Sequence, residues 1–273
     1  NYLYYYELGK IQYRQKKYTD AVRSFTTSCD LNGSFEPSRY NLGVTQLKLG
    51  NDNAALTAFR KAIDINPRYE KAYLEEARLL TKRKDYNGAI NSYENVLAID
   101  NTNVSATMEL GNVYYQSGKL SKAEEKFRQA IFMLKPCADL TLTKFNLSTV
   151  LFDQNKIVEA EKYAREAYQE KEFVKNEKTQ ANIVYNYALI LDKINKVDEA
   201  IPFYMEVLKL NPKHVKTKIN LGVMYMNLTP PDIDTALGLF LQVYEDDKNN
   251  FEANNNLGNV YLIKEDYLNA ILY

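Results

Sequence analysis

The stretch from Leu42 to Pro67, LGVTQLKLGNDNAALTAFRKAIDINP, decides the fold of this 273-residue chain. It holds a small residue, Gly43, an alanine twelve residues later, Ala55, and an aromatic residue four positions beyond that, Phe59. The order recurs, because alanines at the same place are spaced by 34, 34, 34, 37, 40, 36 and 34 residues. They are Ala21, Ala55, Ala89, Ala123, Ala160, Ala200, Ala236 and Ala270. Such a period is typical of a fold that stacks one short supersecondary unit.

Each residue type in the unit has a physical reason. We expect two antiparallel helices joined by a short turn, with the small residue of the first helix facing the alanine of the second where the helices cross most closely. The aromatic residue one turn later fills the space between one hairpin and the next. Proline cannot continue a helix, so it separates hairpins at Pro67, Pro136 and Pro212.

The residue before the small one is usually leucine. The pairs are Leu8-Gly9, Leu42-Gly43, Glu76-Ala77, Leu110-Gly111, Leu147-Ser148, Tyr187-Ala188, Leu221-Gly222 and Leu257-Gly258. Together with the alanines, aromatics and prolines, this pattern resembles that of the tetratricopeptide repeat family over the whole chain. The resemblance implies an all-α, right-handed superhelical solenoid of antiparallel hairpins. It divides residues 1–273 into a single array of eight units at about 2–35, 36–69, 70–103, 104–140, 141–180, 181–214, 215–250 and 251–273, the last one truncated.

Three segments depart from the repeat. Extra residues around Lys135 to Thr141 account for the 37-residue spacing. The charged run from Gln169 to Gln180 accounts for the 40-residue spacing, and we interpret it as a longer second helix followed by a solvated turn. Pro230 and Pro231 lengthen the turn inside the seventh unit. We therefore expect units five to seven to deviate from ideal repeat geometry.

The charge balance argues against a polyanionic partner. The 35 basic residues offset the 35 acidic ones, so we expect no binding to nucleic acid. No apolar run approaches the roughly eighteen residues of a membrane span, so we expect a soluble chain without direct membrane insertion. The cytoplasm is favoured, or the periplasm if a targeting segment has been removed. The chain begins at Asn1 and stops at Tyr273 within a helical pattern, which we interpret as a piece of a longer protein.

Few residues in the sequence are suited to catalysis. His214 is the only histidine, and we expect it to be solvated in the turn after Pro212. Cys29 and Cys137 belong to different hairpins, so they form neither a disulfide nor a pair at metal-ligand spacing. The glycines do not form a phosphate-binding loop. We expect no catalytic residue, no metal and no cofactor.

The first helix of each unit is predicted to line a concave groove. Because its Leu-Gly side is committed to packing, the remaining stripe of residues faces the groove. With the small residue numbered as position eight, the stripe comprises positions two, five, six, nine, twelve and thirteen. Apolar side chains beside amides suit a bound peptide, since apolar contact supplies affinity and amides satisfy backbone groups. The apolar contacts expected to contribute most are Tyr40, Phe145, Tyr185 and Ile219.

Asparagine recurs at position six, and an amide there can satisfy the backbone of a bound peptide because it carries both a donor and an acceptor. The five residues are Asn41, Asn146, Asn186, Asn220 and Asn256, and the other three units have Glu7, Glu75 and Glu109. This is similar to the asparagine ladder of the tetratricopeptide domain in protein O-linked N-acetylglucosamine transferases. The resemblance implies a shared way of holding an extended peptide. The alternative is that the asparagines brace one first helix against the next.

A second resemblance, to the two-carboxylate clamp of chaperone-binding members of the family, is limited to Asn41 and Lys71. Glu75 stands where the clamp has an arginine and would repel a carboxylate. We still expect Lys10, Lys71 and Arg78 to form a mildly basic mouth, and Asn112 adds one more amide to the stripe.

We therefore expect a protein-interaction scaffold that binds an extended polypeptide or partner protein in its concave groove. Two alternatives stay open: the substrate-recruiting arm of a larger enzyme such as a glycosyltransferase, and a purely architectural subunit of a multiprotein assembly. Because the eighth unit lacks most of its second helix, we expect an open apolar face around Leu257, Tyr261 and Ala270 that allows self-association.

Overall fold

The computed structural model describes residues 1–273, and all of its secondary structure is helical. The chain divides into two compact units, Asn1–Leu134 and Lys135–Tyr273. The first unit contains α1 (Tyr2–Arg14), α2 (Tyr18–Leu31), α3 (Glu36–Lys48), α4 (Asp52–Ile65), α5 (Glu70–Lys82), α6 (Tyr86–Ile99), α7 (Val104–Gln116) and α8 (Leu120–Met133). The second contains α9 (Ala138–Asp153), α10 (Ile157–Gln169), the 3₁₀ turn η1 (Lys171–Phe173), α11 (Glu177–Lys193), α12 (Val197–Leu210), α13 (Val215–Met226), α14 (Ile233–Asp246), α15 (Phe251–Ile263) and α16 (Tyr267–Leu272).

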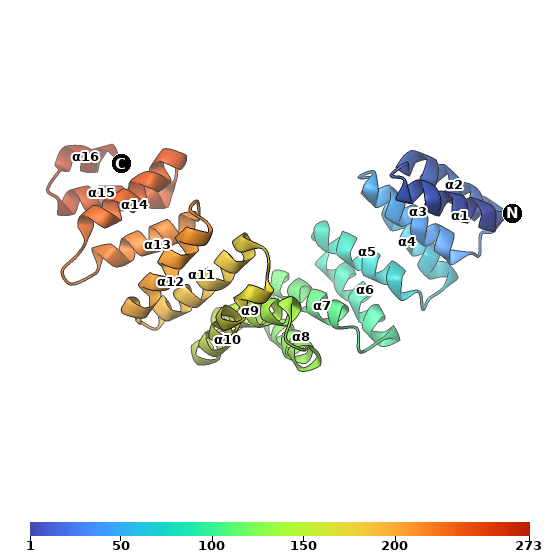
Figure 1. The fold of residues 1–273 in the computed structure, drawn as a ribbon, viewed down its shortest axis with the longest axis horizontal. Coiled ribbons are helices and arrows are strands. Elements are labelled where there is room, and N and C mark those ends of the chain that lie inside the picture. The colour runs from blue at the N-terminus through green and yellow to red at the C-terminus, as the bar shows by residue number, and fades with distance from the viewer. The chain divides into compact units, whose positions relative to one another are not determined.

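The helices pair as successive hairpins. Each odd-numbered α-helix packs against the even-numbered helix that follows it, and within each unit neighbouring hairpins stack on one another (Figure 1). Short turns join the two helices of a pair, so the helices are antiparallel. The prediction of an all-α solenoid of helical hairpins is therefore confirmed. None of the helices combines the length and the apolar character that crossing a membrane requires.

In four hairpins the small residue of the first helix makes room for an aromatic ring. A Cβ atom added to Gly43 would lie 2.5 Å from Cε1 of Phe59, a side chain that is fully buried. Ala55 is also fully buried, but the ring sets the tightest limit on side-chain size at the crossing, and it packs inside its own hairpin. The same contact is made by Gly9 with Phe25, Gly111 with Phe127 and Gly222 with Phe240. The rings also reach the next hairpin, as the sequence interpretation expects, because Phe240 belongs to a core cluster with Ala253, Leu257 and Val260 of α15.

A left-handed residue reverses the chain between the helices of most pairs. After α1, Lys16 has φ 62°, and the N–H of Lys17 donates to the carbonyl of Gln12 at 2.9 Å. This is the Schellman motif, which satisfies the last carbonyls of the helix. Gly50 and Gly118 hold the equivalent place with φ of 77° and 74°, a conformation that glycine adopts without strain. The hairpin of α13 and α14 instead has the longer proline-containing loop that the sequence predicts.

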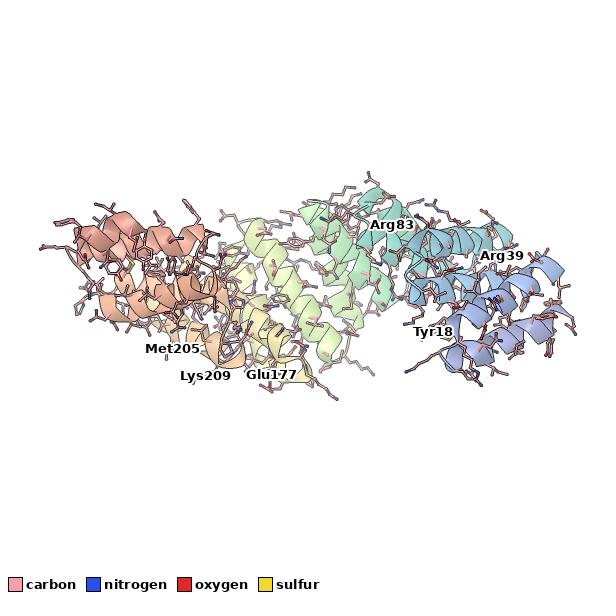
Figure 2. The ribbon with its side chains drawn as sticks, turned by 90° about the horizontal axis from the view of Figure 1, so that it is seen from above. Tyr18, Arg39, Arg83, Glu177, Met205 and Lys209 are labelled. Atoms are coloured by element: carbon pink, nitrogen blue, oxygen red, sulfur yellow. The ribbon has the colours of Figure 1, made fainter.

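The extra residues between α10 and α11 lengthen a first helix and form a turn that is anchored in the core by one apolar side chain. Helix α10 has 13 residues, whereas α11 has 17. Helix α11 begins at Glu177, which is labelled in Figure 2. Between them Val174 is 5% exposed and packs with Ala167 and Ile183. The side chain of Gln180 donates to the Val174 carbonyl at 2.7 Å. The expectation of a longer second helix was wrong, whereas most of the turn is exposed as expected and Val174 alone anchors it in the core.

The last hairpin is covered differently from the prediction. Leu257 is fully buried, and the ring of Tyr261 stacks on Tyr273 with centroids 5.6 Å apart. The exposed apolar surface of this hairpin is formed by other side chains of α15 and α16. Its members are Leu262, Ile263, Tyr267, Leu268, Ile271 and Leu272.

Candidate functional site

Two of the position-six asparagines bind a tyrosine on the preceding first helix. Asn41 Nδ2 on α3 donates to the Tyr6 hydroxyl on α1 at 3.2 Å. Asn220 Nδ2 on α13 donates to the Tyr185 hydroxyl on α11 at 3.2 Å and to the Tyr204 hydroxyl on α12 at 3.3 Å. These bonds brace one hairpin against the next. For Asn220 the amide nitrogen is used by the fold, and Oδ1 is the atom left to accept a hydrogen bond.

Asn186 serves the fold with both ends of its amide. Its Oδ1 accepts from Ser148 Oγ at 2.7 Å, and its Nδ2 donates to Thr149 Oγ1 at 3.2 Å. The residue is 8% exposed. We therefore correct its assignment to a peptide-binding surface. Ser148 stands in the fifth repeat at the position where glycine is usual, and its hydroxyl makes this bond between α9 and α11.

The other predicted groove residues differ from one another in burial and in their contacts. Ile219 is 6% exposed and belongs to the hydrophobic core cluster around Phe240 and Leu257, so it is not a surface contact as expected. Asn256 on α15 is half-buried. Asn146 and Asn112 are half-buried and interact with other groups of the chain.

The predicted aromatic contacts are partly used in packing. The ring of Tyr40 meets Tyr69 edge to face, with centroids 5.5 Å apart. Tyr185 lies 4.8 Å from the ring of His214. Phe145 packs against the small core cluster that contains Val174. All three predicted aromatics are half-buried, so each leaves only part of its surface to a ligand.

The three basic residues do not form a basic mouth. Lys10 Nζ lies 2.8 Å from Glu7, and the guanidinium of Arg78 lies 3.0 Å from Glu75 and 2.7 Å from Glu109. Lys71 is exposed and makes no ion pair within the chain. Lys10 and Arg78 are thus neutralised by carboxylates on their own helices and, for Arg78, also on α7, so the predicted basic surface is corrected.

Glu109 is a structural carboxylate at position six. It accepts from the Tyr93 hydroxyl at 2.5 Å and from Ser105 Oγ at 3.1 Å, besides its ion pair with Arg78. Burial disfavours the ionised form of Glu109, but the hydrogen bonds from Arg78 and Tyr93 and the charge of Arg78 outweigh it and hold the pKa of Glu109 below its usual value. This group links α5, α6 and α7 in the first unit.

A polar pocket opens on the odd-numbered helices of the second unit. It has a volume of about 290 Å³ and lies among α11, α12 and α13. We call it the α11–α13 pocket, and it is lined by Asp192, Asn195, Val197, Asn220, Val223, Met224 and Asn227. The structure thus places one predicted ladder residue, Asn220, in a cavity with two further amides, a carboxylate and three apolar side chains.

Asp192 lies in the predicted stripe, but the sequence analysis did not single it out as a binding residue. It occupies position twelve of the stripe, and the same position is uncharged in the seven other repeats. The residues there are Tyr13, Leu47, Thr81, Tyr115, Phe152, Met226 and Leu262. One charged residue at a position that is uncharged in the other repeats was the sequence signal that could have identified Asp192. Asp192 makes no ion pair within the chain, and burial raises the pKa of its carboxyl.

His214 caps a helix and is not a solvated turn residue. Its Nδ1 accepts from the backbone N–H of Thr217 at 3.3 Å, so it is the N-cap of α13, and its ring packs on Tyr185. To accept this bond Nδ1 must carry no proton, so the cap is made by the neutral form of the imidazole. Burial, followed by the charge of Lys216, lowers the pKa of His214. The predicted solvated histidine is therefore corrected to a structural one.

We expect the free energy of unfolding of the second compact unit, Lys135–Tyr273, to fall in mild acid because of His214. The unfolded chain binds the proton more readily, near the usual pKa of 6.5, than the folded one. The contribution is therefore complete above pH 6.5 and is lost as the pH falls through the lower pKa of the folded state. His214→Asn keeps a capping side chain without titrating, so urea unfolding followed at pH 7.5 and 5.5 should show a smaller pH difference than in the wild-type chain. An unchanged difference would assign the acid sensitivity to another group.

Comparisons with known proteins bear on the fold and the repeat. Family models described as "Tetratricopeptide repeat" match residues 37–69 and 181–214, and one described as "TPR repeat" matches residues 77–118. The chain is 26% identical to Protein O-mannosyl-transferase TMTC3 of Homo sapiens, over 78% of this chain and 26% of that protein. It is 22% identical to DnaJ homolog subfamily C member 7 of Mus musculus, over 77% of this chain and 43% of that protein. The chain spans less than half the length of either relative.

Solved structures share the arrangement of helices. The crystal structure of the APC/C hetero-tetramer Cut9-Hcn1 has a TM-score of 0.66 at 16% identity, covering 89% of this chain and 48% of that chain. YrrB, described as a TPR protein with an unusual peptide-binding site, has a TM-score of 0.57 at 24% identity, covering 73% of this chain and 97% of that one. At these identities the likeness concerns the fold alone.

Proposed function

Since this chain is a tetratricopeptide repeat protein, we propose that it is a protein-interaction scaffold that binds an extended polypeptide along its odd-numbered helices. The proposal takes each of the eight hairpins as one repeat. It is supported by the fold, by the relatives that contain the same repeat, and by YrrB, whose description names a peptide-binding site. Protein and peptide are accordingly the partners we assign.

The observation that carries the proposal is the α11–α13 pocket. An extended peptide needs partners for its backbone N–H and C=O groups and apolar surface for its side chains. The pocket offers both, because the amides of Asn195, Asn220 and Asn227 stand beside Val223 and Met224. Asn220 keeps its position through the two tyrosine hydroxyls, so its free oxygen is presented without a large loss of side-chain entropy on binding.

The proposal assigns binding and no catalytic step to this chain. Its sole histidine is engaged as a helix cap, and Glu109, the most strongly bonded carboxylate on the odd-numbered helices, is held by Arg78 and Tyr93. The transferase named among the relatives is almost four times as long as the matched part. Its activity is therefore not carried over to this segment.

The test uses a peptide library, because the partner is not identified. Pools of N-acetylated heptapeptide amides, randomised except at the central residue, are titrated against the labelled chain. We expect Asn227→Arg to weaken binding of the tightest pool by about tenfold, since a long charged side chain at an exposed position of the pocket blocks it. Gln242→Arg, the same kind of change at an exposed position on the even-numbered helix α14, should leave binding unchanged. Absence of binding to every pool, or equal loss in both variants, would contradict the proposal.

The peptide-library test needs a variant that changes binding without removing a hydrogen bond on which the fold depends. Changing Asn186 or Asn220 removes hydrogen bonds between hairpins, each of which is worth about 0.5 to 1.5 kcal/mol. Alanine at these positions is therefore expected to lower stability, so loss of binding in such a variant would have two explanations. Asn227 is preferable because it is exposed and lies at the end of α13.

We also propose that the exposed apolar side chains of α16 allow self-association. Leu268 is 87% exposed, Ile271 85% and Leu272 70%, and exposed apolar clusters of this kind favour association. The double change Leu268→Lys and Ile271→Lys should shift the chain toward the monomer in sedimentation velocity at 10 to 100 µM, a range set by roughly micromolar association. Phe132→Lys on α8, where the side chain is 93% exposed, serves as the control. Identical sedimentation of all three chains would exclude α16 as the contact.

A further inference from the structure

We propose that the α11–α13 pocket binds a basic side chain of the polypeptide, lysine or arginine, with Asp192 as its counter-ion. This inference rests on the proposed peptide-binding function and names the residue class that the pocket selects. Three features of the pocket carry it: an unpaired carboxylate, amide oxygens beside it, and an apolar wall.

The carboxylate of Asp192 has no counter-charge within the chain. Lys196, on the same hairpin, pairs with Glu199 at 3.4 Å, and Lys193 is exposed and forms no ion pair with Asp192. Asp192 itself is only half-exposed and lines a cavity. A carboxylate that is partly removed from water without a partner is unfavourable, and a bound cation would restore the lost interaction. The cavity therefore suits a cation better than a neutral or acidic group.

The amides around Asp192 supply the additional acceptors that a basic group requires. An ammonium has three N–H donors and a guanidinium has five, so a single carboxylate cannot satisfy either. Asn220 Oδ1 is available because its Nδ2 donates to Tyr185 and Tyr204. Asn195 and Asn227 line the same cavity and are exposed, so each amide can turn its oxygen toward the ligand. Charge-assisted hydrogen bonds of this kind are stronger than neutral ones.

The apolar wall fits the stem of the same side chain. Val197, Val223 and Met224 line the pocket together with the polar groups. Lysine and arginine place three or four methylene groups before their charged end, and these groups bury readily against apolar surface. A pocket with an apolar wall and a carboxylate therefore matches a long basic side chain more closely than a metal ion or a free amine.

The experiment compares library pools on the wild-type chain and on Asp192→Asn. Asparagine has nearly the same shape as aspartate and removes only the charge. With the wild-type chain, pools with lysine or arginine fixed at the centre should bind about tenfold more tightly than the pool with glutamine, the effect of one hydrogen-bonded charge pair. In Asp192→Asn this preference should disappear, while binding of the glutamine pool stays the same. Asp198→Asn, an exposed carboxylate on α12, is the matched control and should keep the preference.

A second readout follows the carboxyl group directly. The side-chain carbon of Asp192 can be titrated by nuclear magnetic resonance in the free chain and with the fixed-arginine pool bound. A cation beside the carboxylate favours its ionised form, so the pKa of Asp192 should fall on binding. The glutamine pool should not produce this change.

The outcomes separate this inference from the proposed function. If the wild-type chain binds the pools without preferring lysine or arginine, or if Asp192→Asn keeps the preference, the basic-residue site is wrong and the peptide-binding scaffold stands. If no pool binds to the wild-type chain, both are wrong. Basic preference that is lost only in Asp192→Asn, with a fall in the pKa of the carboxyl, supports the site.

Discussion

Replacing Gly43 by alanine should destabilise the first unit by about 1 to 3 kcal/mol, although it adds only one methyl group. The new Cβ would lie 2.5 Å from Cε1 and 2.8 Å from Cδ1 of Phe59, closer than non-bonded carbons approach. The ring is fully buried, so it cannot move aside without disturbing its neighbours. Urea unfolding followed by circular dichroism would measure the loss as a lower midpoint with an unchanged slope.

Two other glycines provide the controls for this prediction. A Cβ at Gly258 would have its closest neighbour, the carbonyl oxygen of Ala270, at an ordinary 3.6 Å, and one at Gly238 would meet no atom within 4 Å. Both glycines are helical, where alanine is favoured over glycine by about 0.5 to 1 kcal/mol. Gly258→Ala and Gly238→Ala should therefore be neutral or stabilising. A stable Gly43→Ala variant would show that the ring is free to move and that the crossing is looser than described.

Replacing Glu109 by alanine should destabilise the first unit by about 1.5 to 3 kcal/mol, the range for hydrogen bonds to a charged group. The change leaves the hydroxyl of Tyr93, a side chain that is 1% exposed, without its acceptor and leaves Arg78 paired only with Glu75. Glu75→Ala is the control, because it removes the more peripheral carboxylate from Arg78 and should cost less than about 1 kcal/mol. Equal losses in the two variants would mean that the hydroxyl of Tyr93 does not depend on Glu109.

The same carboxylate should make the first unit sensitive to acid. The pKa of Glu109 lies below its usual 4.5 in the folded chain, so the unfolded chain takes up the proton first. The stabilisation is complete above pH 4.5 and is lost as the pH falls through the lower pKa of the folded state. The stability difference between the wild-type chain and Glu109→Ala, measured by urea unfolding at pH 7 and pH 3.5, should therefore shrink at the lower pH. A constant difference would assign the interaction to packing.

The sequence by itself determined the repeat and its helical nature. Small residues, alanines and aromatics at a fixed spacing leave one solution, a helical hairpin whose apolar faces are buried by its neighbours. The pattern is local, since every contact that defines it lies within one hairpin or between adjacent ones. The longer loop at Pro230 follows from the same spacing, whereas α9 and α11 begin at Ala138 and Glu177, before the unit boundaries that the spacing predicts.

Only the tertiary structure decided which polar side chains are available to a ligand. Asn186 and Asn220 stand at the same position of their repeats. Both ends of the Asn186 amide form hydrogen bonds, to Ser148 and Thr149, whereas Asn220 keeps its oxygen free. What differs is the residue on the neighbouring hairpin that each amide meets, and sequence position does not give that distance. Likewise, Asp192 differs from an ordinary surface carboxylate because no cation reaches it and a cavity opens beside it. Repeat periodicity fixes where a residue lies on its helix, whereas its partners depend on how two different hairpins pack.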